Sequence, residues 1–227
     1  MNVDGVDLLG YSMPLMDVDI DQAKKVYDVN VWGVLRTTQI FSPLIIAAQG
    51  TIVIIGSIAG IMPYVFGGTA EYPIVLTMLT VSLGAYNSSK AAIQSIADTL
   101  RIEMYPFNVK VINICTGGVK TNLSPKAIEA YNLVLPPDSL YTSIEPYFKK
   151  RQGYSNANAI TRADYAQRVV SSIVKAKRSG WIWKGYFASR CWFLATFCWK
   201  TVFDVFMLKT FGLKEMRKII EQRRKSQ

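Results

Sequence analysis

The chain has 227 residues, half of them apolar, which suits one domain with a sizeable core and excludes a disordered chain. The net charge is +10, but no nucleic-acid-binding motif accompanies the basic residues, so we expect no nucleic-acid partner. There is no histidine, and the three cysteines are scattered. We therefore exclude a His-based catalytic triad and predict no metal site.

The first predicted element is a long helix that begins after Asp19, a suitable N-cap with Gln22 three residues later. Within it, Asn30 stands in the sequence Val-Asn-Val-Trp-Gly. From the residues alone, Asn30 is either part of a site or a polar residue that fills a helix kink. The apolar positions predict a core face made of Val26, Val29, Val34 and Leu35.

Three short apolar runs predict the strands of a sheet, at residues 51–57, 109–115 and 181–185. The first is a continuous β-branched run, typical of a parallel strand covered on both faces. Pro43 and Gly50 bracket the passage into it, and it ends at Ser57. A Ser at a strand end is most often a turn residue, so its assignment to a site depends on what lies beside it.

Residues 84–104 predict a helix whose start carries the sequence Tyr86-Asn-Ser-Ser-Lys90. Tyr86 and Lys90 are four residues apart, so both project from one helix face. A phenol has a pKa of about 10, and an ammonium one turn away is expected to lower it. Such a pair can pass a proton to or from an alcohol. The predicted buried face of this helix contains Ala91, Ile93, Ile96, Ala97, Leu100 and Met104.

The last third of the chain contains a helix over 161–175, a strand over 181–185 and a tail over 186–227. Thr161 and Asp164 form the N-terminal box of that helix. The tail has an uncharged aromatic run over 191–199 and a basic helix over 214–225. The run is too short to span a bilayer and is typical of a segment in a membrane interface, or of a tail that packs on its own domain or a dimer partner.

The ordered set of Ser57, Tyr86 with Lys90, and the glycine turn over 116–121 resembles the short-chain dehydrogenase/reductase family. The resemblance implies an α/β fold: a Rossmann-type parallel sheet with helices on both faces. It implies that Tyr86 is the proton donor, that Lys90 lowers its pKa and binds the nicotinamide ribose, and that Ser57 orients the carbonyl. Asn30 would hold a water that links Lys90 to solvent.

The same resemblance implies a set of residues that bind an NADPH cofactor. Besides Tyr86 and Lys90, these are the glycine turn with Gly117, the backbone of Val119 and the hydroxyl of Thr121. Arg36 is either a further contact on the cofactor side or a surface residue. The family commonly forms homodimers through the helix that carries the Tyr and Lys.

The sequence departs from the family pattern in two places. The first βαβ strands and the glycine-rich loop that binds the pyrophosphate have no counterpart, so we expect 1–185 to be a partial domain. We expect the 227 residues alone to bind NADPH weakly or not at all and to show no measurable reductase activity. Ser57 and Tyr86 are 29 residues apart, where the family has about a dozen. The apparent insertion is 68–83, and we leave two explanations open: a lid for an apolar substrate, or a translated intron.

Within the family, the motifs and the aromatic tail resemble the fungal NADPH-dependent 1-acyldihydroxyacetone-phosphate reductases. These make lysophosphatidic acid at lipid droplets and the endoplasmic reticulum. The resemblance implies a lipid ketone substrate and a location on the cytosolic face of those membranes. The alternatives are a reductase of another lipid or steroid ketone, and a catalytically inactive membrane-associated remnant.

Overall fold

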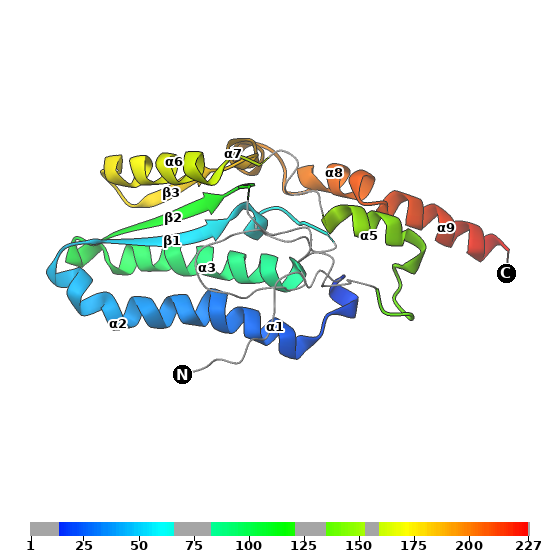
Figure 1. Ribbon diagram of the computed structural model, residues 1–227, viewed down its shortest axis with the longest axis horizontal. Helices are drawn as coiled ribbons and strands as arrows, with labels where there is room; N and C mark the ends of the chain where they lie inside the picture. Colours follow the sequence, from blue (N-terminus) through cyan, green and yellow to red (C-terminus); the bar gives the residue numbers. More distant parts are fainter. Residues whose placement is uncertain (1–13, 66–82, 121–134, 153–158, 227) are drawn as a thin grey trace.

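The computed structural model describes residues 14–65, 83–120, 135–152 and 159–226 of the chain. At its centre is a three-stranded sheet in the order β1-β2-β3, with every neighbouring pair parallel. The sheet lies between two layers of helices, α2 and α3 on one face and α6 on the other (Figure 1). The predicted α/β arrangement is confirmed in this part of the chain.

The three strands form where the apolar runs predicted them, to within one residue. They are β1 (Thr51–Ser57), β2 (Lys110–Thr116) and β3 (Gly180–Lys184). The register pairs Ser57 with Thr116 at the carboxyl ends of β1 and β2. Polar side chains thus meet at the sheet edge where ligands of open α/β sheets bind.

Short helical turns and α5 connect the main elements. Their bounds are η1 (Leu15–Asp17), η3 (Ile58–Gly60), η4 (Tyr105–Phe107), η5 (Thr142–Ile144) and α5 (Glu145–Gln152).

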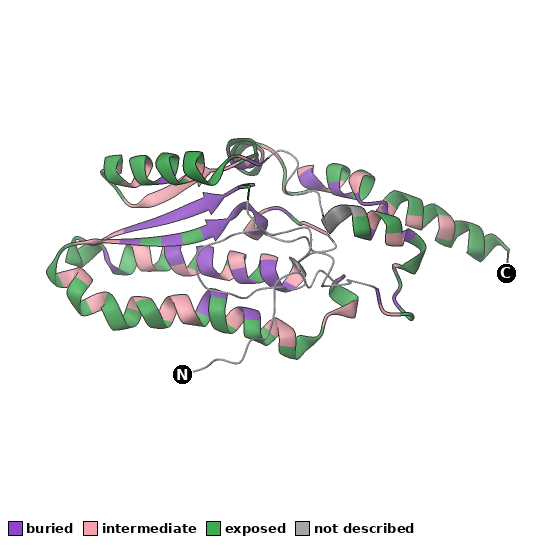
Figure 2. Cartoon of the chain, viewed as in Figure 1, coloured by how far each residue is buried: buried purple, intermediate pink, exposed green. Residues whose placement is uncertain are grey.

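The two faces of the sheet carry separate apolar clusters. Helix α3 (Leu83–Glu103) packs on one face through Ile93 and Ala97, against Ile52, Ile54 and Val111. Helix α6 (Arg162–Lys175) packs on the other face through Val169, against Ile112 and Ile114. Figure 2 shows the resulting buried band along the strands and the exposed outer sides of α2 and α6.

Strand β1 differs from the prediction, because one of its faces is open. Val53 and Ile55 remain 36% and 38% exposed, on the face opposite α3. Helix α6 lies over β2 and β3 and does not reach them. The β-branched run correctly predicted a strand, but no local pattern shows whether a second layer covers it.

The first long helix forms in three parts: α1 (Ile20–Tyr27), the π turn η2 (Asp28–Gly33) and α2 (Val34–Ala47). The Asp19 carboxylate accepts hydrogen bonds from the amides of Asp21 and Gln22, as the N-cap prediction requires. The π turn inserts an extra residue and rotates the helix faces. Val26 is therefore fully buried, whereas Val29, predicted for the same face, is 46% exposed.

Pro43 lies inside α2, which corrects the expectation that the passage into β1 begins at Pro43. A proline at this position removes the amide that would bond the carbonyl of Gln39. The Ser42 hydroxyl donates to that carbonyl at 2.8 Å instead. The helix continues to Ala47 and the chain turns at Gln49, which has a φ of 47°.

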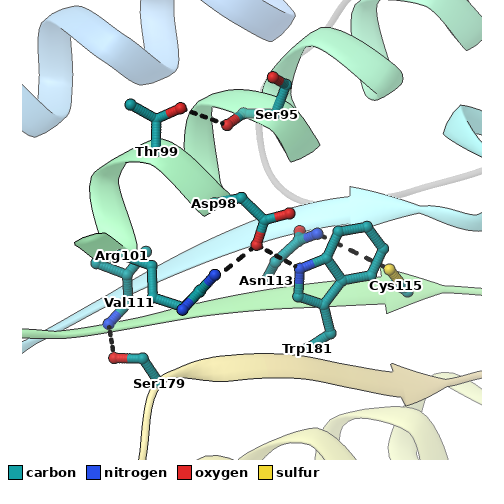
Figure 3. A network of polar contacts seen from close by, with 9 residues as sticks. All are labelled: Ser95, Asp98, Thr99, Arg101, Val111, Asn113, Cys115, Ser179 and Trp181. Atoms are coloured by element: carbon teal, nitrogen blue, oxygen red, sulfur yellow. Dashed lines mark hydrogen bonds and ion pairs between the residues drawn. The ribbon is translucent and has the colours of Figure 1, made fainter. Parts of the chain in front are cut away.

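Helix α3 is tied to β3 by a polar network (Figure 3). The Trp181 indole donates to the Asp98 carboxylate at 2.8 Å, and Arg101 lies 3.5 Å from the same oxygen. The predicted buried face of α3 is largely confirmed, but Ala91 is exposed. Ala91 belongs instead to the wall of a cavity described below.

Helix α6 begins as predicted, with the Thr161 hydroxyl accepting a hydrogen bond from the Asp164 amide. The C-terminal helices follow β3: α7 (Ala188–Phe197), α8 (Val202–Thr210) and α9 (Leu213–Lys225). One side of α7 and α8 packs on the domain in a cluster with Ile58, Ile144 and Phe148. No described helix is both long and apolar enough to cross a bilayer.

Candidate active site

The end of β1 and the start of α3 bring Ser57, Tyr86 and Lys90 together. Ser57 is 3% exposed, and its hydroxyl caps η3 by accepting from the Ala59 amide at 3.1 Å. The Tyr86 ring packs on Ala59, one turn beyond that cap. Since the cap fixes η3 and η3 supports the ring, the strand end positions the first turn of α3.

The Tyr86 side chain is closed off from solvent. The residue is 8% exposed, and its hydroxyl makes no hydrogen bond of good geometry with the described residues. Burial raises the pKa of Tyr86, and the nearby Ser57 hydroxyl opposes that shift only in part. The expected lowering of this pKa is therefore wrong for this arrangement, because desolvation outweighs the neighbouring groups.

Lys90 faces the ring of Tyr86 and the edge of β1. Its ammonium lies 5.7 Å from the ring centroid and donates to the Ile55 carbonyl at 3.1 Å. Desolvation lowers the pKa of Lys90 to about 8, although part of the side chain still reaches solvent. A lysine with this pKa exchanges its proton close to neutral pH.

Asn30 lies in the π turn η2, so it fills a helix kink, as one interpretation of the sequence has it. It also contacts the start of the helix that carries Tyr86, as the other interpretation requires. Its side-chain amide donates to the Ser89 hydroxyl at 3.1 Å, and Ser89 donates to the Tyr86 carbonyl at 2.8 Å. All three residues are buried. The chain of bonds ties the helix kink to the first turn of α3, behind the Tyr86 side chain.

The sequence did not single out two residues that hold this group in place. Ser89 is the link just described, and Gln94 donates from its amide to the Ser57 carbonyl at 2.6 Å. Gln94 is 4% exposed and follows Tyr86 and Lys90 at the same four-residue spacing. That spacing on one helix face is the signal that could have found it.

Backbone hydrogen bonds hold the glycine turn after β2, from the end of β3 on one side and from Ile160 on the other. Gly117 donates to the Lys184 carbonyl at 2.7 Å, and Gly118 exchanges backbone bonds with Tyr186. A Cβ at Gly117 would lie 2.1 Å from the Tyr186 carbonyl oxygen, so only glycine fits there. Val119 is buried and forms a parallel bridge with Ile160.

The structure does not test two of the predicted cofactor residues, Thr121 and Arg36. Thr121 lies outside the described residues, as do the insertion over 68–82 and residues 1–13. Arg36 is exposed on α2, and no hydrogen bond or ion pair connects it to Tyr86 or Lys90 among the described residues. The exposure of Arg36 fits both interpretations, and its role on the cofactor side stays a prediction.

An open cavity of about 480 Å³ adjoins the group. Its lining is mostly apolar and shares Ala59 and Tyr64 with the packing around the Tyr86 ring. The cavity is large enough for part of an organic ligand. Other residues of its wall are Leu15, Met62, Ala91, Tyr141 and Leu213.

The described residues fit only one end of a dinucleotide. The resemblance implies that Tyr86, Lys90 and the glycine turn bind the nicotinamide and its ribose, and the Tyr86 hydroxyl has no hydrogen-bond partner among the described residues. A pyrophosphate needs a glycine-rich loop at a helix N-terminus, and none is found among the described residues. The same part of the chain holds no cluster of three His, Cys, Asp or Glu side chains suited to a metal.

Comparison with known proteins gives a consistent set of relatives. A family profile described as short chain dehydrogenase matches residues 4–71 and 77–132. The chain is 32% identical to short-chain dehydrogenase fogD of Aspergillus ruber, over 96% of this chain and 70% of that protein. It is 34% identical to short-chain dehydrogenase virD of Hypocrea virens, over 91% of this chain and 65% of that protein. The chain thus spans about two thirds of the length of these relatives.

Solved structures show the same fold at lower identity. A short-chain dehydrogenase from Streptomyces avermitilis has a TM-score of 0.54 at 15% identity, over 96% of this chain and 69% of that one. A short chain dehydrogenase from Burkholderia cenocepacia, solved in complex with NADP, has a TM-score of 0.51 at 19% identity, over 85% and 64%. These likenesses agree with a Rossmann-like sheet covered by helices.

Proposed function

This chain belongs to the short-chain dehydrogenase/reductase family, and from that premise we propose that it serves NADPH-dependent reduction of a ketone with a long apolar group. The observation that carries the proposal is the meeting of Ser57, Tyr86 and Lys90 beside an apolar cavity. A lipid ketone such as 1-acyldihydroxyacetone phosphate, with lysophosphatidic acid as its product, has the required chemistry. The cavity supports the apolar part of this assignment and carries no information on the phosphate.

In the proposed reaction, the chain's own residues handle the carbonyl oxygen. NADPH, when bound, would supply a hydride to the carbonyl carbon. Tyr86 donates its phenolic proton to the oxygen, and Ser57 donates a hydrogen bond to the same atom. Because burial raises the pKa of Tyr86, the phenol keeps its proton at neutral pH, which the reductive direction needs.

Lys90 and the glycine turn would hold the nicotinamide end. The Lys90 ammonium lies one helical turn from Tyr86, within reach of a ribose beside the phenol, and its pKa of about 8 suits the return of a proton to Tyr86. The backbone of Val119 and the hydroxyl of Thr121 would bind the carboxamide and a phosphate. The choice of NADPH rests on the family resemblance, and the Burkholderia cenocepacia relative in complex with NADP supports it.

A second candidate is a protein that binds without catalysing. One observation favours it: Lys90 bonds a strand-edge carbonyl, and the Tyr86 hydroxyl is closed off from solvent. In this arrangement the Tyr86 hydroxyl is not open to a substrate, and the Lys90 ammonium is engaged by the strand. A chain held this way would keep the cavity and lose the proton transfer.

The test uses a chimera in which this chain replaces the matching region of fogD from Aspergillus ruber. We expect it to oxidise NADPH with long-chain ketones, and Tyr86→Phe to lower turnover by about 10²-fold or more. Tyr105→Phe, at a tyrosine that is 81% exposed, is the matched control and should leave turnover unchanged. Equal loss in both variants, or none in Tyr86→Phe, contradicts the assignment.

Two further arms separate the alternatives. The chimera is also made without residues 68–83, and higher activity without them favours an intron over a lid. A folded chimera that binds NADPH but reduces no ketone in either form supports the non-catalytic candidate. A panel of acyl, alkyl and steroid ketones separates the lipid substrate from its rivals.

A further inference from the structure

Helix α7 presents an exposed aromatic surface. Trp192, Phe193, Phe197 and Trp199 are 44%, 53%, 64% and 69% exposed, and we call these four residues the aromatic face. Phe197 contacts both Trp192 and Phe193, at centroid distances of 5.8 and 5.3 Å. The three rings on α7 thus form one cluster, and Trp199 lies exposed two residues after the helix ends. Clustered exposed apolar side chains mark an interaction surface.

The core of the domain does not need these rings. The opposite side of α7 already packs inward through Ala188 and Cys191, both fully buried in the cluster with Phe203 and Phe211. The helix is therefore apolar on two sides, one of them covered by the domain. The next helix, α8, adds exposed apolar residues of its own: Val205, Phe206 and Leu208.

Basic residues flank the aromatic face and fill the helix that follows. From 188 to 225 the chain has nine Lys and Arg against three acidic residues. Two of the three acidic residues, Glu215 and Glu221, pair within α9 with Lys218 and Arg217. Most of the positive charge therefore has no ion-pair partner in the described part, including Arg190, Lys200, Lys209 and the terminal run Arg223, Arg224 and Lys225.

We propose that the aromatic face and α9 bind the surface of an anionic lipid bilayer. Aromatic rings enter the boundary between headgroups and acyl chains, and Lys and Arg bond the anionic headgroups beside them. The segment lies in the interface and does not cross the membrane. The proposal uses no residue of the catalytic group and stands whatever the substrate is.

Charge argues against a second copy of the chain as the occupant. Two copies meeting through this surface would bring the same excess of positive charge together. The cores of protein interfaces are depleted in charged residues, whereas here cations border the rings on both sides. An anionic surface satisfies the rings and the cations together.

The test is sedimentation of the full chain with vesicles of phosphatidylcholine containing phosphatidylserine. We expect binding that weakens at high salt and is much weaker on pure phosphatidylcholine. The double variant Phe193→Glu, Phe197→Glu should lower binding about tenfold or more. The matched control, Ile40→Glu with Leu44→Glu, makes the same charge change at exposed sites of α2 and should keep more binding.

A separate variant tests the basic residues of α9 in the same sedimentation assay. Neutralising Arg223, Arg224 and Lys225 by Gln should weaken binding about fivefold for each cation removed. These residues are exposed, so the variant keeps the packing of the domain. Circular dichroism of every variant checks the fold.

A second measurement does not depend on charged substitutions. Trp192 and Trp199 should be quenched by brominated lipids, and Trp192→Phe with Trp199→Phe should remove that quenching. No binding to anionic vesicles by the folded chain overturns the proposal, as does equal binding by the double variant and its α2 control. A stable dimer in light scattering that Phe193→Glu, Phe197→Glu dissociates would assign the surface to a second copy and overturn it as well.

Discussion

The two neighbouring strands of this sheet have opposite surroundings. Strand β2 is buried on both faces, between α3 and α6, whereas β1 is covered on one face only, by α2 and α3. The register pairs Ile114, which is fully buried, directly with Ile55, which is 38% exposed. An isoleucine is thus fully buried on β2, while its partner on β1 lies on a face that no described element covers.

The candidate active site lies on the open strand. Ser57 ends β1, and Lys90 bonds the β1 carbonyl of Ile55. The geometry of the group is set by these contacts, and burial shifts the pKa values of Tyr86 and Lys90.

The largest expected difference in the free energy of unfolding is between alanine variants of the paired residues Ile114 and Ile55. Ile114→Ala should lower the free energy of unfolding by about 2–5 kcal/mol, because it leaves a cavity in the core. Ile55→Ala should cost less than about 1 kcal/mol, because its side chain is already partly hydrated. Chemical denaturation of both variants measures the difference, and equal losses would show that β1 is covered in solution.

The second largest expected loss of stability concerns the hydrogen bond between Trp181 of β3 and Asp98 of α3. Trp181→Phe removes the indole that donates to Asp98 and should cost about 1–2 kcal/mol. Trp183→Phe is the matched control, since its ring lies 5.7 Å from that of Trp181 and carries no indole bond in the described network. Should the two variants unfold at the same denaturant concentration, the Asp98 bond contributes nothing.

The pH dependence of stability tests the burial of Lys90, which bonds strand β1. The pKa of Lys90 falls from 10.5 to about 8 on folding, so between these values the unfolded chain binds more protons than the folded one. Stability from this group must then rise with pH across that range. The free energy of unfolding of the natural chain relative to Lys90→Met should rise by about 1 kcal/mol between pH 7 and pH 10, a discounted value for a partly exposed group.

Measuring stability relative to Lys90→Met cancels the contributions of other groups whose stability changes with pH in the opposite direction. Burial raises the pKa values of Tyr86, Cys115 and Cys191, so each contributes stability that is lost as the pH rises through and above its ordinary pKa. These losses occur in both proteins and cancel. A relative stability that is flat from pH 7 to pH 10 would mean that Lys90 is solvated.

The smallest effect concerns α2. Ser42→Ala leaves the Gln39 carbonyl without its side-chain donor and should cost a few tenths of a kcal/mol, since the bond is exposed. Thermal unfolding compared with Thr99→Ala, where the lost bond duplicates a helical one, measures it. A larger effect would show that Pro43 strains the helix.

Local patterns predicted the elements and failed where distant parts of the chain decide. Continuous β-branched runs and N-caps at Asp19 and Thr161 located strands and helices, because those signals act within a few residues. The exposure of Val29 could not be predicted, since the π turn that rotates it depends on the packing of Asn30 against Ser89.

The site shows the same division. The spacing of Tyr86 and Lys90 correctly predicted one helix face, and the resemblance brought Ser57 to it. The direction of the Tyr86 pKa shift was wrong, because burial depends on the elements that surround the ring and not on its neighbour one turn away. Gln94 was missed because its partner is the backbone of a strand 37 residues earlier.

Titration of the purified 227-residue chain with NADPH tests most directly the proposal that the described residues bind only the nicotinamide end of the cofactor. The account predicts no saturable heat at micromolar NADPH, since these residues would contact the nicotinamide end and the described part of the chain has no glycine-rich loop for the pyrophosphate. The fogD chimera, measured beside it, should bind with a micromolar Kd. Saturable micromolar binding of one NADPH per chain by the 227 residues alone would contradict the account.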